Sequence, residues 1–231
     1  MQEECLICKA PLEYLKADFE AECSLCHKKE YTKVHCINGH YVCNQCHTQG
    51  LDTVIALCLA ETSQNPIEII NRLMAQHFCH MHGPEHHVLV GASLLTAYRN
   101  AGGKIELEDA LKEAIKRGKN VPGGVCGFWG ACGAGISSGI FISVVTESTP
   151  LTETPWGLSN KMTSTSLAAI GAIGGPRCCK RDSYLAISSA VTFARENLGI
   201  HMEYTAPHCT YSQKNNQCIG SRCPFFADGD K

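Results

Sequence analysis

The chain has 231 residues, of which 44% are hydrophobic and 18% charged, a composition that argues against a disordered protein. Its formal net charge of −2 argues against the strongly basic surface that nucleic-acid or anionic-membrane binding favours. Sixteen cysteines and 11 histidines are the unusual feature. The first residues lack the basic and apolar segments of a secretory leader, so we expect a cytoplasmic protein with reduced thiols that bind metal or carry out redox chemistry.

The first 47 residues hold seven cysteines in a pattern typical of metal ligands. A pair of cysteines two residues apart places both thiolates on one tight turn, where they reach the same tetrahedral ion. Two such pairs are followed by a third set of three cysteines and one histidine, which together make eight ligands for two zinc ions. The predicted ligands are Cys5, Cys8, Cys23, Cys26, Cys36, His40, Cys43 and Cys46.

The spacing leaves several readings of this segment open. The ligands pair either in sequential order, as in a zinc ribbon, or in the cross-braced order of RING-like modules. His27, His35 or His47 could replace a cysteine. Free thiols without metal, and a rubredoxin-like iron site at the first four cysteines, are the alternatives. Because a site with four protein ligands has no open position, we expect structural metal that supplies folding energy.

Beyond the module the pattern becomes helical. We expect a two-site zinc module at 1–50 and a helical cysteine-rich domain at 51–231, which makes the fold mainly α with a small N-terminal zinc-ribbon or RING-like metal module. Asn65 followed by Pro66 predicts the start of a helix. Apolar positions predict further helices at 51–60, 88–98 and 107–115, and another capped by Asp182.

The segment 121–146 contains no charged residue and is long enough to span a bilayer. It also contains proline, several glycines, serines and two cysteines, with no aromatic belt and no basic flank of one sign. We therefore expect a helix buried in the protein core and no membrane contact.

Five histidines and one carboxylate lie within residues 77–87. The Gly83-Pro84 turn directs residues on its two sides toward one point. Neutral imidazole is both a metal ligand and a general base near neutral pH, so Glu85, His82 and His86 are predicted catalytic residues or ligands. The alternative is an ordinary solvated histidine-rich corner.

A second candidate site follows a glycine turn at 174–176. Thiols beside cations at a helix N-terminus have a lowered pKa and react as thiolates. Cys178 or Cys179 is therefore the predicted nucleophile, with Arg177 and Arg181 holding a small anionic substrate.

The remaining cysteines suggest a cofactor. Two lie in a glycine-rich stretch that permits either close approach to a cofactor or close packing of helices. Three lie in the tail, where the last precedes a proline, as recurs at iron–sulfur ligands. The predicted ligands of an iron–sulfur cluster are Cys126, Cys132, Cys209, Cys218 and Cys223, whereas Cys58 and Cys79 suit buried structural thiols.

The paired cysteines of the module and the segments 80–87, 127–134, 174–182 and 222–226 resemble a prokaryotic family of unknown function. That family occurs alone and fused to radical-SAM proteins, which implies a radical-SAM protein or another redox partner. Residues 130–135 and Cys178-Cys179 are also similar to small helical proteins described as redox-active, with a cysteine–glycine–cysteine–alanine signature. Their further cysteine is missing here, where Gly91-Ala92-Ser93 stands.

Two functions follow. The first is an iron–sulfur or thiol-dependent enzyme, an oxidoreductase or transferase, that performs redox, sulfur-transfer or group-transfer chemistry in the helical domain. The second is a zinc-dependent binding module, or a sensor of redox state or metal, without catalysis. Lys28, Lys29 and Lys33 could contact nucleic acid, but the acidic balance of the chain argues against this partner.

Overall fold

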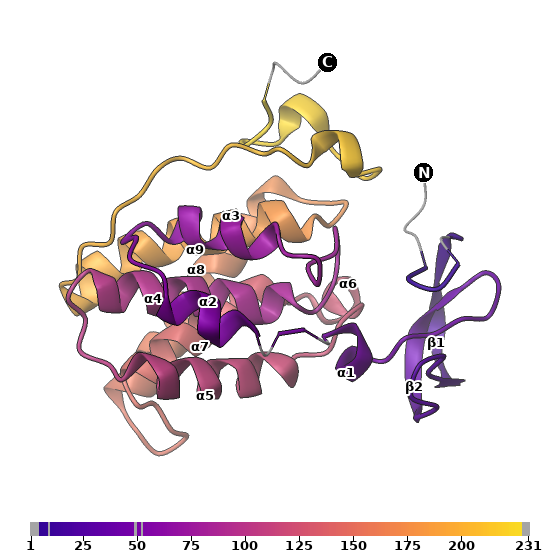
Figure 1. Ribbon diagram of the computed structural model, residues 1–231, viewed down its shortest axis with the longest axis horizontal. Helices are drawn as coiled ribbons and strands as arrows, with labels where there is room; N and C mark the ends of the chain where they lie inside the picture. The colour runs from indigo at the N-terminus through magenta and orange to yellow at the C-terminus, as the bar shows by residue number, and fades with distance from the viewer. Residues whose placement is uncertain (1–4, 9, 49, 52, 228–231) are drawn as a thin grey trace.

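The computed structural model describes residues 5–8, 10–48, 50–51 and 53–227. It is mainly α-helical with a small cysteine-rich module at the N-terminus, as predicted (Figure 1). The strands are β1 (Leu12–Glu22) and β2 (Lys29–Cys36). The α-helices are α1 (Asn44–His47), α2 (Thr53–Leu59), α3 (Pro66–Met74), α4 (His86–Asn100), α5 (Leu107–Lys119), α6 (Cys126–Trp129), α7 (Gly133–Val145), α8 (Thr154–Ile173) and α9 (Cys179–Leu198).

The module is built on an antiparallel hairpin of β1 and β2. The strands pair from Glu22 opposite Lys29 to Leu12 opposite Cys36, with an irregularity between Tyr14 and Phe19. Most side chains of both strands are exposed or half-buried. The buried cluster of the module contains Ala21, Cys23, Tyr41, Cys43 and Cys46, three of which are predicted metal ligands. The hairpin therefore has too little apolar core to be stable without another source of folding energy.

Helix α1 leads from the module to the helical domain, and polar contacts join the two parts beside it. The Arg177 guanidinium donates to the Tyr14 hydroxyl at 2.6 Å. The backbone N–H of Gly123 donates to Asn44 Oδ1 at 3.2 Å. Figure 1 shows the hairpin beside one end of the helical bundle, with α1 between them.

Helix α4 is the centre of the helical domain. Its residues from His86 to Tyr98 are buried without a break, and α2, α3, α5, α7 and α9 all pack against it. A helix that is apolar on nearly every side is stable only when it is surrounded by other elements. The predicted helix at 88–98 is therefore confirmed, and it begins two residues earlier.

The neighbouring helices α3 and α5 follow the sequence closely. The Asn65 side chain accepts from the backbone N–H of Ile67 at 3.0 Å, and Pro66 is the first residue of α3. Helix α5 buries the predicted apolar stripe and carries acidic residues in its first turn and basic residues in its last. Both charge placements are favourable for a helix dipole.

The uncharged segment 121–146 forms a turn and two helices, α6 and α7. Within the described ranges, no helix has both the length and the apolar character needed to cross a membrane. Helix α7 lies between α4 and α8. The Ser137 hydroxyl accepts from the backbone N–H of Gly91 at 2.9 Å, and a Cβ added at Gly139 would lie 1.8 Å from Thr163 Oγ1. Small residues therefore allow close packing of these helices.

Two features of α8 and α9 differ from the prediction. Cys178, rather than Asp182, is the N-cap residue of α9, and its sulfur accepts from the backbone N–H of Arg181 at 3.5 Å; Asp182 lies in the first turn. Helix α8 has only Met162 and Ser166 fully buried among its 20 residues. It therefore has no apolar stripe from which the sequence could have predicted it.

After α9 the tail returns across the bundle over α3 and α9 (yellow in Figure 1). The Asn65 amide donates to Thr205 Oγ1 at 2.9 Å, and the rings of Tyr184 and Phe225 lie 5.4 Å apart. Two short 3-10 helices, Ser212–Lys214 and Gly220–Arg222, complete the tail. This path brings the tail cysteines to the N-terminal end of α9.

Candidate metal centres and the adjoining cleft

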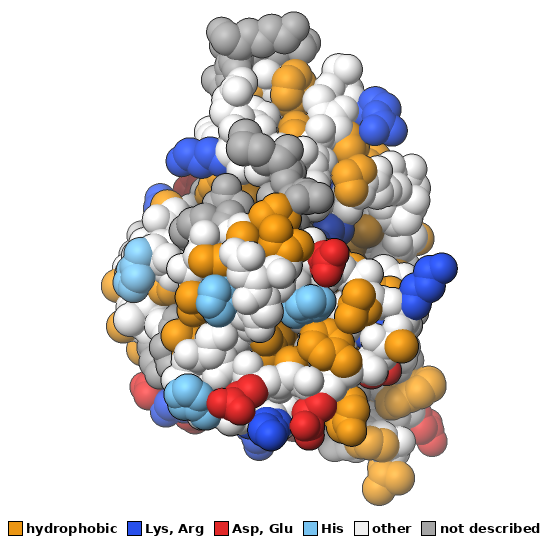
Figure 2. Space-filling model, turned by 90° about the vertical axis from the view of Figure 1, so that its right-hand side faces the viewer, with side chains coloured by type: hydrophobic (Ala, Val, Ile, Leu, Met, Phe, Trp, Pro, Cys, Tyr) orange, Lys and Arg blue, Asp and Glu red, His pale blue; other side chains and the backbone are white. Residues whose placement is uncertain are grey.

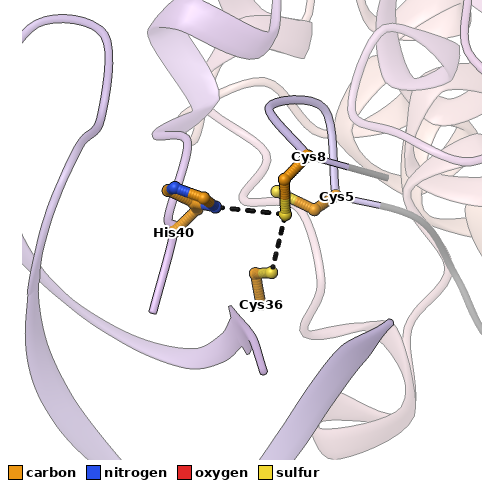
Figure 3. Close-up of side chains that lie close together, drawn as sticks. All are labelled: Cys5, Cys8, Cys36 and His40. Carbon is orange, nitrogen blue, oxygen red and sulfur yellow. Dashed lines mark hydrogen bonds between the residues drawn. The ribbon is translucent and has the colours of Figure 1, made fainter. Parts of the chain in front are cut away.

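The first candidate metal centre joins the two ends of the hairpin (Figure 3). Cys8 Sγ lies 3.5 Å from Cys36 Sγ and 3.2 Å from His40 Nδ1. With Cys5, these four side chains offer ligand atoms that all lie within 4.8 Å of one another. Three sulfurs and one imidazole around one point form a complete tetrahedral ligand set.

The second candidate centre lies at the opposite end of the hairpin. Cys23, Cys26, Cys43 and Cys46 offer four sulfurs within 4.8 Å of one another, and Cys26 and Cys43 are 3.6 Å apart. Three of these four cysteines are buried. Both groups could hold a metal ion, and neither leaves a coordination position for substrate.

The order of the ligands along the chain is cross-braced. The first and third pairs share one group, and the second and fourth pairs share the other. Of the two pairing schemes that the spacing allowed, sequential and cross-braced, the structure shows the cross-braced one. It also rules out a rubredoxin-like site at the first four cysteines, because these are divided between the two groups.

Backbone hydrogen bonds favour the thiolate form of two ligands. The backbone of Ala10 lowers the pKa of Cys8 to about 6. Burial opposes ionisation of Cys23, but backbone N–H groups of Cys43, Cys26 and Leu25 lower its pKa to about 6. The thiolate is the form that binds metal. Of the alternative histidines, His27 pairs with Glu22 and His35 with Glu13, whereas His47 points away from both groups toward Glu85.

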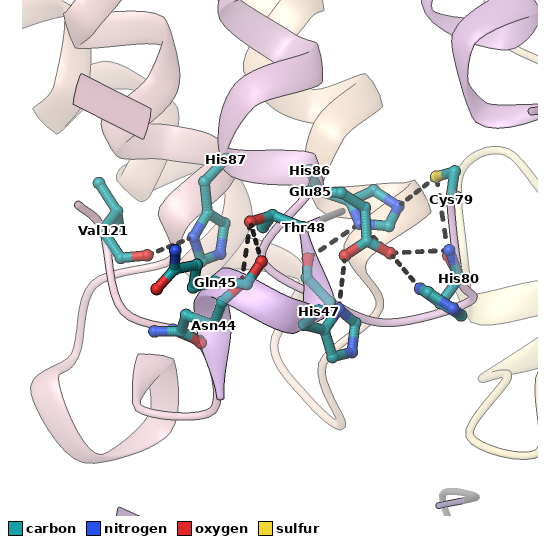
Figure 4. A network of polar contacts seen from close by, with 12 residues as sticks. Asn44, Gln45, His47, Thr48, Cys79, His80, Glu85, His86, His87 and Val121 are labelled. Atoms are coloured by element: carbon teal, nitrogen blue, oxygen red, sulfur yellow. Dashed lines mark hydrogen bonds and ion pairs between the residues drawn. The ribbon is translucent and has the colours of Figure 1, made fainter. Parts of the chain in front are cut away.

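Glu85 is the centre of a buried polar network at the start of α4 (Figure 4). Its side chain is fully buried, and its Oε1 accepts from the backbone N–H of His80 at 2.7 Å. His80 Nδ1 lies 3.3 Å from Oε1, and His47 Nδ1 lies 3.1 Å from Oε2. Burial alone would raise the pKa of Glu85, but His47 and His80 hold it well below its usual value. The carboxylate is therefore ionised.

His86 and Cys79 lie behind this carboxylate. His86 Nδ1 bonds to the Gly83 carbonyl at 3.0 Å, and its Nε2 lies 3.7 Å from Cys79 Sγ. Burial lowers the pKa of His86 to about 3, so the ring is neutral. The Lys180 ammonium lies 3.1 Å from the Cys79 sulfur. Cys79 is therefore part of a polar network, not only a packing thiol.

The vicinal cysteines at the start of α9 do not have the expected electrostatics. Burial raises the pKa of Cys178 to about 11 and raises the pKa of Cys179 well above its usual value. The prediction of a lowered pKa is therefore wrong, because loss of water outweighs the neighbouring cations. Arg181 is buried and donates to Asp182 and to the carbonyls of Gly174 and Pro176. These internal contacts contradict its predicted role of holding substrate.

The tail cysteines gather around a second, smaller cavity. Cys178, Cys209, Cys218 and Cys223 line it together with apolar and aromatic side chains and with Arg181, Ser212 and Asn215. Cys126 and Cys132 are not among the described residues that line this cavity; Cys132 instead lies 3.7 Å from Asp182 Oδ2. The structure therefore groups the three tail cysteines with Cys178, which the sequence predicted as a nucleophile.

A large cleft of about 890 Å³ lies between the module and the helical domain. Both parts of the molecule line it. The module contributes Tyr14, Lys33 and His47. The helical domain with its tail contributes His80, Met81, His82, Gly83, Arg177 and Asn215. Figure 2 views the molecule from the side of the module. On this face lysine and arginine side chains stand apart from one another, with histidine, acidic and hydrophobic side chains between them.

Three groups in this region were missed by sequence reasoning. His47 was considered only as a spare zinc ligand, and Asn215 and Lys180 were not singled out at all. Each reaches the site from a distant part of the chain. For His47, the sequence contained one indication: it directly follows Cys46, a predicted metal ligand. A bound ligand fixes the position of the residue that follows it.

Comparison with known proteins places the chain in a family without an assigned activity. The model of a family of unknown function (DUF5714) matches residues 54–226, and the chain belongs to that family. This confirms the resemblance that the sequence motifs indicated. No curated protein and no solved structure matched the chain.

Proposed function

We propose that this protein is an iron–sulfur enzyme that carries out redox chemistry on a small anionic substrate in the cleft, with two structural zinc ions in the module. The observation that carries the proposal is that four cysteines line one small cavity beside the cleft: Cys178, Cys209, Cys218 and Cys223. Four thiolates are the usual ligand set of an iron–sulfur cluster. Cys178 takes the place of Cys126 and Cys132 in the ligand set expected from the sequence.

The backbone around these cysteines supports a metal-ligand role. In the module, Cys5 accepts from the N–H of Ile7, two residues later, at 3.3 Å. In the tail, Cys209 accepts from the N–H of Tyr211 at 3.4 Å. Cys218 accepts in the same way from the residue two positions later, also at 3.4 Å. Such donors favour the thiolate and tune the potential of a bound cluster, although burial outweighs them at Cys209 and raises its pKa.

The cavity communicates with the cleft through a directed chain of hydrogen bonds. The backbone N–H of Cys179 can only donate, so His82 Nδ1 accepts from it at 3.5 Å and Nε2 carries the ring proton. His82 Nε2 then donates to Asn215 Oδ1 at 3.3 Å, and the Asn215 amide donates to Cys178 Sγ at 3.4 Å. Asn215 lines both the cleft and the cavity. A substrate in the cleft would lie one side chain away from the cluster ligand.

The other predicted residues have supporting places in this scheme. Arg177 lines the cleft and is the proposed partner of the anionic substrate. His82 is a positioning residue for Asn215. A cluster of this kind exchanges electrons with a second protein. We propose a radical-SAM protein or another redox protein as this partner.

Anaerobic purification followed by metal and sulfide analysis tests the proposal. We expect brown protein with visible charge-transfer absorption, equal amounts of iron and acid-labile sulfide, and two zinc ions per chain. Cys209→Ser and Cys223→Ser should lose the absorption and the iron but keep the zinc. Cys126→Ser is the matched control and should keep the cluster.

Three results would contradict this function. The first is colourless protein with zinc as its only metal, which would favour a binding or sensing module without catalysis. The second is iron without sulfide, which would indicate a single-iron centre. The third is a cluster that survives Cys209→Ser but is lost in Cys126→Ser, which would restore the ligand set expected from the sequence.

A further inference from the structure

The buried Glu85 carboxylate is contacted by histidines from two separate parts of the chain. His47 is the last residue of α1 in the module, whereas His80 lies in the connection before α4. One ligand atom from each of these three residues lies within 4.8 Å of the other two. The imidazole rings have their centroids 4.8 Å apart at an interplanar angle of 69°, and Figure 4 shows the carboxylate between them.

Ordinary hydrogen bonding does not account for this arrangement. His47 Nδ1 and Glu85 Oε2 are 3.1 Å apart, yet neither atom has a hydrogen-bond partner of acceptable geometry within the described residues, and both atoms are buried. Buried polar atoms without a hydrogen bond are rare in proteins and need an explanation, and these two have only their ion-pair contact with each other. A cation bound by both atoms would satisfy them, since metal coordination does not require the direction of a hydrogen bond.

The absence of a side chain at Gly83 leaves room for the three ligand side chains. A Cβ at this position would lie 2.2 Å from Glu85 Oε2 and 2.4 Å from His47 Cε1. Any larger residue would push the carboxylate and the imidazole apart. The glycine therefore permits the close approach that the three side chains make.

A competing set of ligands lies on the other side of the carboxylate. Cys79, Glu85 and His86 also offer atoms within 4.8 Å of one another. However, the Lys180 ammonium lies 3.1 Å from the Cys79 sulfur and would repel a cation there. This side of Glu85 therefore supports the carboxylate rather than binding metal.

The first set differs from the closed groups of the module in its exposure. His47 and His80 line the cleft, whereas Glu85 is buried behind them. We propose that His47, His80 and Glu85 form a third metal site, which binds a divalent transition-metal ion and keeps an open position toward the cleft. Two imidazoles and one carboxylate are the protein ligands of many catalytic zinc and non-haem iron sites.

The open position defines the class of ligand that the site accepts. A divalent ion held by three protein groups binds water or an oxygen atom of a substrate at the remaining position. Arg177 lines the same cleft, so an anionic oxygen donor, such as a carboxylate or a phosphate, fits best. This site does not depend on the proposed cluster, because the two share no ligand.

Titration with Co²⁺ tests this site, on protein from which mild chelation has removed all metal beyond the two zinc ions of the module. We expect the wild type to bind one Co²⁺ per chain in addition to its two zinc ions. Removal of one of three protein ligands in His80→Ala should weaken this binding at least about 100-fold, because loss of a supporting group alone costs about 10- to 100-fold. His47→Ala should have the same effect from the module side. Zinc analysis of each variant shows that the module is still folded.

His77→Ala is the matched control, because His77 is an exposed histidine three residues before His80 and outside the ligand group. It should bind Co²⁺ as the wild type does. The site is overturned if the wild type binds no further ion, or if His80→Ala binds Co²⁺ unchanged. A sulfur-to-cobalt charge-transfer band would also overturn it, since that band means that the ion has entered a cysteine group. Loss of the cluster would leave this titration unchanged.

Discussion

The module and the helical domain use cysteine in opposite ways. In the module, the cysteines converge in two groups and make up most of the buried cluster. In the helical domain, the buried cluster consists mainly of aliphatic and aromatic side chains with Cys58 among them, and Cys79 and Cys132 pack against it. We therefore expect the first part to depend on bound metal for its fold, whereas the second part is stabilised by apolar burial.

The largest expected effect is that of metal removal on the module. Cys43→Ser, or chelation of the wild type, should unfold the module and cost it about 10 kcal/mol or more of binding free energy, as for structural zinc in small domains. The helical domain should keep its structure. Far-ultraviolet circular dichroism measures the helices, and hydrogen exchange of the amides of β1 measures the hairpin. Cooperative loss of both signals would show that the two parts do not differ in this way.

The second prediction concerns the apolar core. Phe141 is fully buried and packs edge-to-face against Tyr98 at 5.7 Å. Phe141→Ala should lower the free energy of unfolding of the helical domain by about 3–5 kcal/mol. Zinc content should not change. Phe128→Ala, at a position with 45% exposure, is the control and should cost far less in the same urea titration.

A smaller effect is expected where α7 meets α8. A Cβ at Gly139 would lie 1.8 Å from Thr163 Oγ1 and 3.0 Å from the Ser159 carbonyl oxygen. Gly139→Ala should therefore cost about 1–3 kcal/mol through overpacking, although alanine favours a helix. Gly171→Ala in α8 meets nothing within 4 Å and should be neutral or slightly stabilising. Equal melting temperatures for the two variants would show that the helices do not approach closely at Gly139.

The smallest effect is a dependence of stability on pH. Burial opposes ionisation of Glu61, but hydrogen bonds from Arg72 and from the backbone of Ser63 and Thr62 lower its pKa. Because the pKa is lower in the folded state, the carboxylate stabilises the fold above its unfolded pKa, and this contribution is lost as the pH falls through the folded pKa. Glu61→Gln should cost about 1 kcal/mol at pH 7 and almost nothing in strong acid.

Urea titrations of the whole protein at pH 7 and in strong acid measure the cost of Glu61→Gln under the two conditions. Glu108→Gln is the control, because Glu108 and its partner Lys112 are both more than half exposed. It should change the stability by less than about 0.5 kcal/mol. A cost of Glu61→Gln that is the same at both pH values would mean that its ionised form is not the stabilising one.

Local patterns predicted most of the helical domain. The Asn65-Pro66 cap, the stripe of α5 and the apolar run of α4 each lie within one segment, so the sequence contains all the information that places them. Helix α8 was missed because its side chains make few buried contacts. The N-cap of α9 was assigned to Asp182 because aspartate is the usual capping residue, but the turn at Gly174-Gly175-Pro176 positions Cys178 instead.

The candidate sites were predictable only in part. Ligand spacing identified the eight residues of the module but not their pairing, since both pairing schemes satisfy the same turns. Of the cluster at residues 77–87, the structure brings His80 and His86 to Glu85, while His47 comes from the module and could be placed only by the fold. The pKa of Cys178 was predicted in the wrong direction because a sequence shows neighbouring charges but not the exclusion of water.

The interleaved order of the ligands also has a consequence for synthesis of the protein on the ribosome. The first metal group is complete only when His40 has emerged, and the second only when Cys46 has emerged. Until then, the nascent chain presents cysteine pairs that can take up a metal ion with the wrong partners, above all the first four cysteines. Correct loading must therefore be reversible during translation, and its outcome is settled only after the last ligand pair has left the exit tunnel.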